Sequence, residues 1–189
     1  QWEDASSEKF KFVTVTSGSG TIPVGTDTEI RTSNYASVVS DGRMYFTVVT
    51  EAKDYGTSGI KIGRNAEFFK IVLDGTLAVG DVITFTEGKD GSGQICFSTS
   101  AASQPTRSTA PQTTSGSYTV TSTDGLSGQK TFYVWRVSSS VFVKNLTVTG
   151  ASSSTYTVSF SDGTCGNHGT YTGDDITQAS AGEEITLPT

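Results

Sequence analysis

Apolar residues in this chain occur in short runs rich in Val, Ile, Thr, Tyr and Phe. No stretch long enough for a helix repeats its apolar residues at i, i+3 and i+4. Such runs are typical of strands. The pattern predicts strands over Phe10–Thr16, Arg43–Thr50, Glu67–Leu73, Val82–Thr86, Gln94–Thr99, Ser117–Thr121, Lys130–Val137 and Val141–Thr149, with a shorter one at Ile60–Ile62.

Glycine and aspartate separate these runs. Glycine supplies positive φ angles, and aspartate bonds to nearby backbone, so both favour turns. Many short strands separated by such turns predict a sandwich or a barrel. The predicted turns are Ser17–Gly20, Ser40–Gly42, Asp74–Gly75, Val79–Asp81, Lys89–Gly91 and Asp124–Gly125.

Two runs, Phe68–Leu73 and Phe132–Trp135, are largely apolar at consecutive positions. A strand covered on both faces has this pattern, whereas a strand with one face in water alternates. We therefore expect an all-β fold, a two-sheet antiparallel β-sandwich with a small C-terminal β extension.

Two low-complexity segments organise the chain. Residues 101–116 are rich in Ser, Thr, Pro and Gln, and strands of the same character resume after them, which predicts a long surface loop. Residues 150–154 read as a flexible linker. The sequence thus predicts a sandwich domain over 1–150, followed by a linker and a partial β-repeat or spacer over 151–189.

Charge narrows the range of partners. A net charge of −6 and a pI near 4.7 argue against nucleic acid. No apolar run approaches the ~20 residues of a membrane helix. Cys96 and Cys165 are the only cysteines; one disulfide or two separate thiols both fit.

The segment from Gly59 to Gly150 resembles the β-jelly-roll accessory modules of secreted polysaccharide-degrading proteins of the Bacteroidetes type. The resembling phrases are Gly59–Ile62, Phe69–Leu73, Leu77–Ile83, Thr131–Arg136 and Val141–Val148. The resemblance implies a jelly roll whose last strand returns beside its first. It also implies secretion or a cell-surface location, a covalent link to further domains, and carbohydrate binding through aromatic side chains.

Such modules often carry a structural Ca²⁺. The acidic pair Glu3 and Asp4 resembles the N-terminal motif of the calcium-binding members. A strand-end carboxylate such as Asp81 would complete an oxygen ligand set that converges from separate segments. Calcium held by Glu3, Asp4 and Asp81 is therefore expected from the resemblance.

A second, local resemblance concerns the C-terminal part. Tyr156–Phe160, Gly169 and Ala181–Pro188 are similar to the opening of the internalin-type β-repeat, a spacer of bacterial surface proteins. This implies that the natural protein continues beyond Thr189. Alternatively, the stretch adds two strands to the main sandwich.

Catalytic chemistry finds little support. His168 is the only histidine, and Cys165 with His168 lacks the further ligands of a closed zinc site. Many carboxylates could form a glycosidase pair, but no spacing singles out two of them, and Asp41, Asp74 and Asp90 simply precede turn glycines. A non-enzymatic role is expected.

Aromatic side chains are the stronger candidates, since flat rings stack on sugars. Tyr133 and Trp135 share one face of a strand, with Phe132 and Val134 on the other face, which is the natural core. Arg136 follows. Tyr133 and Trp135 form an exposed platform, or else Trp135 packs beneath the loop that contains Pro105 and Pro111.

Tyr45, Tyr55 and Tyr118 are further candidates, and Tyr55 is the most loop-like of them. The expected ligand-binding set is therefore Tyr55, Trp135, Tyr133, Tyr118, Tyr45 and Arg136. We expect a non-catalytic carbohydrate-binding module that brings an attached enzyme to a plant cell-wall polysaccharide such as xylan, glucan or pectin. The alternative is an adhesin or structural stalk domain without glycan binding.

Overall fold

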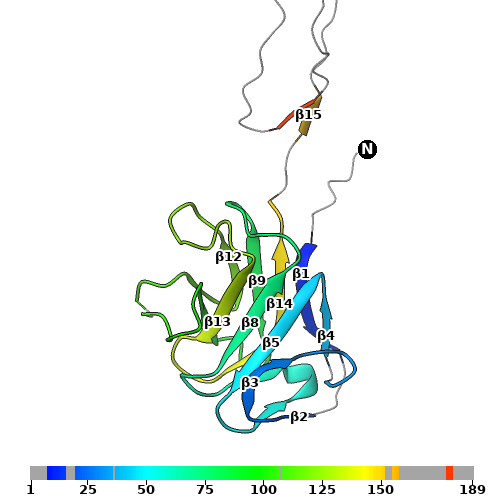
Figure 1. Cartoon of the computed structure of the whole chain (residues 1–189), viewed down its shortest axis with the longest axis vertical. Coiled ribbons are helices and arrows are strands. Elements are labelled where there is room, and N and C mark those ends of the chain that lie inside the picture. Colours follow the sequence, from blue (N-terminus) through cyan, green and yellow to red (C-terminus); the bar gives the residue numbers. More distant parts are fainter. Residues whose placement is uncertain are drawn as a thin grey trace, which may run out of the picture. The chain divides into compact units, whose positions relative to one another are not determined.

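The computed structural model of this chain describes residues 8–15, 20–35, 37–106, 108–151, 155–157 and 178–180. Two sheets pack face to face (Figure 1), and every strand pairing in them is antiparallel. The predicted all-β, two-sheet antiparallel sandwich is confirmed.

The strands divide unequally between the sheets. The eight-stranded sheet contains β1 (Glu8–Thr14), β2 (Gly20–Ile22), β4 (Ser37–Ser40), β6 (Ala52–Asp54), β7 (Ile60–Ile62), β9 (Val82–Glu87), β12 (Gly116–Thr119) and β14 (Val141–Thr149). The six-stranded sheet contains β3 (Gly25–Glu29), β5 (Gly42–Val48), β8 (Phe68–Leu73), β10 (Gln94–Ser98), β11 (Gln112–Thr114) and β13 (Thr131–Arg136).

The core of this arrangement has jelly-roll connectivity. In one sheet β1, β14, β9 and β12 are neighbours in that order, and in the other the order is β8, β13, β10 and β11. Apart from the step from β10 to β11, the chain crosses between the sheets each time it passes to the next of these strands. The last strand, β14, pairs with the first, β1, as a jelly roll requires.

The chain between β1 and β8 widens both sheets, and its strands β2 and β3 lie at the lower end of the sandwich in Figure 1. β5 and β3 extend the six-stranded sheet beside β8, and β4 pairs with β1. β7, β6 and β2 extend the other sheet from the first residues of β14, because β7 pairs with Val141–Val143. A short 3-10 helix (Gly56–Ser58) joins β6 to β7.

The core lies between the two sheets. Phe12, Phe46 and Phe69 are fully buried there, with ring centroids 6.4 Å apart for Phe12 and Phe69 and 4.5 Å for Phe46 and Phe69. Phe132 and Val134 point into it, as their positions in the run predicted. Each such side chain contributes roughly 1.5–3 kcal/mol by leaving water.

The sandwich belongs to a compact unit that spans Ser6–Ala151. Beyond it, β15 (Thr155–Thr157) pairs with β16 (Gln178–Ser180) as a two-stranded antiparallel sheet of its own. These strands therefore do not extend either sheet of the sandwich. The remaining residues of the expected β-repeat lie outside the described residues.

Candidate functional site

Tyr55 stands on a tight turn at the end of β6. The carboxylate of Asp54 is buried and accepts hydrogen bonds from the Gly56 N–H at 2.8 Å and the Ser37 hydroxyl at 3.4 Å. The Tyr55 N–H donates to the Gly59 carbonyl at 3.0 Å. The backbone of Tyr55 is thereby fixed while its side chain remains 42% exposed.

Two glycines let this turn lie against the sandwich. A Cβ atom on Gly59, whose φ is +96°, would lie 2.1 Å from the Val143 carbonyl oxygen. A Cβ atom on Gly88 would lie 1.9 Å from the Ser58 carbonyl oxygen. Larger residues would push the turn away from β14 and from the loop after β9.

The close approach brings Tyr55 onto Phe142 of β14. The two rings meet edge to face, with centroids 5.2 Å apart and planes at 64°. Phe142 lies between buried Val141 and Val143, so its side chain is on the outer face of the eight-stranded sheet. Lys61 lies opposite it on β7.

A groove of about 410 Å³ runs beside Tyr55 and Lys61. Glu67 is 3% exposed and accepts hydrogen bonds from the N–H groups of Gly63 at 2.9 Å and Arg64 at 3.0 Å, which fixes one wall. Arg64 donates from Nε to the Thr50 hydroxyl at 3.0 Å. The groove is lined by Thr50, Glu51, Ala52, Lys53, Tyr55, Lys61, Gly63, Arg64 and Glu67.

We call Tyr55, Phe142, Lys61, Lys89 and this groove the Tyr55 surface. Between residues 8 and 151, among the residues that the structure describes, Tyr55 is the one aromatic residue in the set of exposed large hydrophobic side chains. Sequence reasoning selected Tyr55 and missed Phe142, Lys61 and Lys89. The alternation Val141-Phe142-Val143 was the available signal, because it places Phe142 opposite two core residues.

Trp135 does not form an exposed platform. It is 2% exposed, and its indole N–H donates to the Ser98 hydroxyl at 2.9 Å. It packs with Phe68, Cys96 and Val137, and Ala110 covers this cluster. The alternative expectation, in which Trp135 lies beneath the loop, describes the structure.

The covering loop also holds Arg136. The Gln104 side-chain amide donates to the Arg136 carbonyl at 2.7 Å, and Phe97 N–H donates to the Pro111 carbonyl at 2.8 Å. The Arg136 guanidinium donates to Asn65 Oδ1 at 2.8 Å. These contacts tie loop and strand together at this end of β13.

Tyr133 and Tyr45 lie on the outer face of the six-stranded sheet, on the two strands that flank β8. The strand register places Tyr45 beside Lys70 and Lys70 beside Tyr133. Lys70 Nζ lies 5.1 Å from the Tyr45 ring centre and 3.1 Å from the Asp27 carboxylate. All three side chains are half-buried. We call Tyr45, Lys70 and Tyr133 the tyrosine row.

A second groove, of about 310 Å³, lies near Tyr45. Arg31 and Glu29 form an ion pair on its wall. This contact raises the pKa of Arg31, first through the hydrogen bond to Glu29 and then through its charge. The hydrogen bond to Tyr45 likewise raises the pKa of Arg43. Both guanidinium groups are thus already engaged within the fold.

Tyr118 has a structural position. Its ring packs on Phe97 with centroids 5.5 Å apart, and its hydroxyl donates to the Asp124 carboxylate at 2.7 Å. Burial, followed by the bond to Asp124, raises the pKa of Tyr118 to about 12. Half-buried and bonded in this way, the ring faces the core and offers no open face for stacking.

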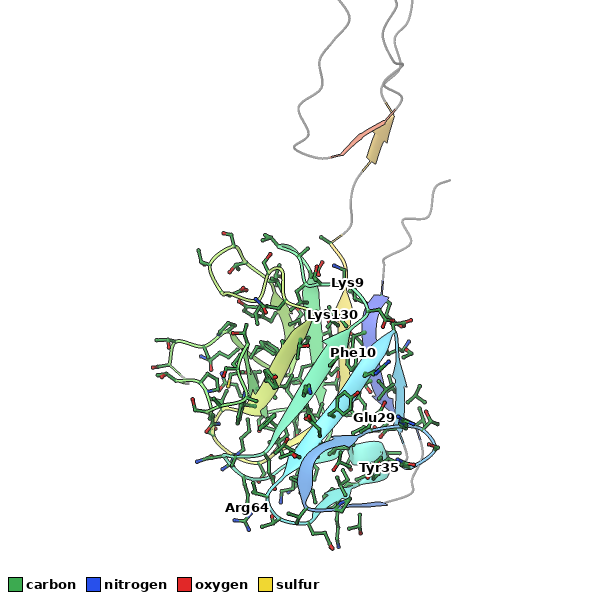
Figure 2. All side chains as sticks on the ribbon, in the orientation of Figure 1. Lys9, Phe10, Glu29, Tyr35, Arg64 and Lys130 are labelled. Carbon is green, nitrogen blue, oxygen red and sulfur yellow. The ribbon has the colours of Figure 1, made fainter. Side chains whose placement is uncertain are left out.

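Asp81, the expected calcium ligand, is engaged by protein groups. It is 1% exposed, pairs with Lys9 Nζ at 2.6 Å, and accepts hydrogen bonds from the N–H groups of Ala78 at 2.8 Å and Ala151 at 3.1 Å. Figure 2 shows Lys9 near the upper end of the sandwich. Glu3 and Asp4 lie outside the described residues. Among the residues that are described, no cluster of three or more His, Cys, Asp or Glu side chains could hold a metal.

Other buried carboxylates also serve the backbone. Glu87 is 7% exposed and accepts N–H bonds from Lys89 at 2.9 Å, Asp90 at 2.8 Å and Gly91 at 2.8 Å, and from Phe142 at 3.1 Å. Cys165 and His168 lie outside the described residues. Cys96 is buried in the Trp135 cluster.

Comparison with protein-family models, curated proteins and solved structures gave no match. In the part of the chain that is described, no helix has the length and apolar character needed to cross a membrane.

Proposed function

We propose that this chain is a non-catalytic carbohydrate-binding module and that the Tyr55 surface holds the glycan. One observation carries the proposal: an aromatic side chain that is 42% exposed is fixed on a rigid turn beside a polar groove. A free aromatic face stacks on the C–H groups of a sugar, and polar groups bind the hydroxyls.

The rigidity of the turn supports this role. Asp54 and the Tyr55–Gly59 backbone bond hold the ring before any ligand arrives. A ring that is already placed loses little conformational entropy on binding, so more of the stacking energy appears as affinity. Lys53, Arg64 and Thr50 in the groove supply donors for sugar oxygens.

A non-enzymatic role is supported by the use made of the buried carboxylates. Glycoside hydrolysis needs two carboxyl groups free to exchange protons across a sugar. Glu67, Asp81 and Glu87 instead accept backbone N–H bonds, and Asp81 is also paired with Lys9. We propose that the module is secreted or surface-borne and keeps an attached enzyme at a plant cell-wall polysaccharide by raising its local concentration.

Affinity gel electrophoresis in xylan, mixed-linkage glucan and pectin tests the proposal. Tyr55→Ala should abolish retardation, lowering affinity about tenfold or more, because a central aromatic contact is lost. Tyr55→Phe should retain most of it, since the stacking face remains. Val79→Ala, another exposed apolar side chain in a distant loop, is the matched control.

Each alternative has its own outcome. Loss of binding with Tyr133→Ala or Tyr45→Ala, but not with Tyr55→Ala, would move the site to the tyrosine row. The absence of retardation in every polymer would reject glycan binding and favour the adhesin or stalk role.

A further inference from the structure

Two lysine side chains converge on one aromatic ring at the Tyr55 surface. Lys61 Nζ lies 5.7 Å and Lys89 Nζ lies 5.5 Å from the centre of the Phe142 ring. The negative face of an aromatic ring attracts each ammonium group. Lys61 comes from β7 and Lys89 from the loop after β9, and β7 and β9 pair with β14 on its two sides. An anion beside either ammonium group would gain a favourable charge interaction.

The carboxylates nearest in sequence form no ion pair with either lysine in the described part of the chain. Glu87 is turned toward the N–H groups of its own loop and of Phe142. Asp90 accepts from the Ser92 N–H at 3.0 Å and the Ser92 hydroxyl at 2.7 Å. The hydrogen bonds to Ser92 lower the pKa of Asp90, and the charge of Lys89 lowers it further. The ion pairs found among the described residues involve Lys9, Lys11, Arg31 and Lys70, and neither Lys61 nor Lys89 is in them.

The adjoining groove continues the same charge. Lys53, Lys61 and Arg64 line it, and Glu51 is its one exposed carboxylate. Glu67 also lines the groove, but it is buried and bonded to the N–H groups of Gly63 and Arg64. A ligand in this groove therefore meets more accessible cations than anions.

This local excess of positive charge lies on a chain that is acidic overall. The net charge is −6, which repels polyanions at long range. Screening limits such repulsion to about 8 Å at physiological ionic strength. At contact distance the lysines beside Phe142 therefore decide which glycan is favoured.

We infer that the Tyr55 surface selects an acidic polysaccharide: uronic acid residues place their carboxylates beside Lys61 and Lys89 while a neighbouring ring stacks on Tyr55. The inference rests on the proposed function and names its ligand class. A carboxylate beside an ammonium group gains a charge-assisted hydrogen bond, which a neutral sugar cannot provide.

The experiment compares two polymers with the same rings and different charge. The full chain is titrated with polygalacturonate and with fully methyl-esterified polygalacturonate, by affinity electrophoresis and calorimetry at physiological ionic strength. Wild-type protein should bind the acidic polymer more tightly. The double variant Lys61→Gln/Lys89→Gln should lose roughly threefold to tenfold in affinity for polygalacturonate, the range expected of two exposed ion pairs. Its affinity for the ester should be unchanged.

Lys130→Gln is the matched control. Lys130 is an exposed lysine near the upper end of the sandwich, away from Arg64 at the lower end (Figure 2). The Lys130→Gln variant should bind both polymers as the wild type does. The preference for polygalacturonate should also shrink as salt is raised, because exposed charges are screened.

The failures are separable. Equal binding of acid and ester, with loss of both in Tyr55→Ala, would overturn the uronate inference and leave the proposed function standing. Binding of neither polymer, nor of xylan or glucan, would overturn both. Tighter binding of dextran sulfate than of polygalacturonate would show a general anion preference and overturn the assignment to uronates.

Discussion

Tyr118 and Asp124 show how one side-chain pair links a loop to the core. Burial alone would raise the pKa of Asp124. The N–H groups of Thr121 and Leu126 and the Tyr118 hydroxyl outweigh burial, so the pKa is lowered overall. Asp124 therefore contributes stability above its unfolded pKa near 3.8, and this contribution is lost as the pH falls below that value.

Tyr118 contributes stability that is lost at high pH, the opposite direction to Asp124. Its pKa is about 12 in the fold and 10.0 when unperturbed. The unfolded chain therefore loses this proton first, and the stability due to Tyr118 falls as the pH rises from about 10 to about 12. Urea unfolding midpoints of wild type and Tyr118→Phe should differ at pH 8 and converge across that interval. Midpoints that stay equally far apart at every pH would contradict the assignment.

At the residue scale, the sequence could predict local chemistry but not which side chains are buried by segments distant along the chain. Tyr55 was selected because Gly, Asp and Ser around it indicate a turn, and turns are exposed. The strand parity of Trp135 was also correct, since Phe132 and Val134 are in the core. Its burial depends on Ala110 in a loop distant along the chain, and no local pattern encodes that contact. Phe142 pairs with Tyr55 for the same non-local reason.

At the scale of elements, buried and half-buried carboxylates connect loops to strands. Asp54, Glu67, Asp81, Glu87 and Asp124 each accept at least one backbone N–H bond near a strand end. A charged acceptor strengthens such bonds. Glu87 accepts the most backbone N–H bonds of the five and connects the loop after β9 to Phe142 near the start of β14.

Glu87→Gln should therefore destabilise the sandwich by about 1–3 kcal/mol, because the amide places an N–H₂ group against backbone donors. Denaturant unfolding measures the loss. The Glu87→Gln substitution should also reduce affinity for polygalacturonate, since the loop that Glu87 holds positions Lys89. Glu51→Gln changes an exposed carboxylate and should cost within about 0.5 kcal/mol. Equal losses in the two variants would contradict the role of Glu87.

The strands themselves were predictable in proportion to their apolar content. β14 was predicted with its observed bounds, Val141–Thr149, and β7 likewise at Ile60–Ile62. Five short strands of the sandwich were missed: β2, β4 and β6, and β3 and β11. β3 and β11 lie at the two edges of the six-stranded sheet and carry polar, partly exposed side chains, so no apolar pattern marks them. β2, β4 and β6 are only three or four residues long, too short to show a period.

At the scale of the whole sandwich, the Tyr55 surface forms where two parts of the fold meet. Tyr55 and Lys61 come from the segment inserted between β1 and β8, whereas Phe142 and Lys89 belong to the jelly roll. The jelly roll alone would present an aromatic ring without its neighbouring tyrosine. The candidate site thus depends on the insertion, and changes in that segment offer a route to different ligands on the same sandwich.

The pairing of β1 with β14 has a mechanical consequence. Glu8, the first residue of β1, lies opposite Thr149, the last of β14. When the chain is pulled at residues 8 and 151, the force acts first on the β1–β14 hydrogen bonds nearest Glu8 and Thr149. These bonds then break one after another, which is an unzipping geometry. Tension between residues 8 and 139 would instead shear all the β1–β14 bonds together.

Single-molecule force spectroscopy should find a lower rupture force for pulling between residues 8 and 151 than between residues 8 and 139. Equal forces would mean that another contact, such as the Lys9–Asp81 pair at this end, limits opening. A sandwich that unzips under axial load is poorly suited to a chain under tension. This geometry therefore fits the proposed glycan-binding role better than a load-bearing stalk.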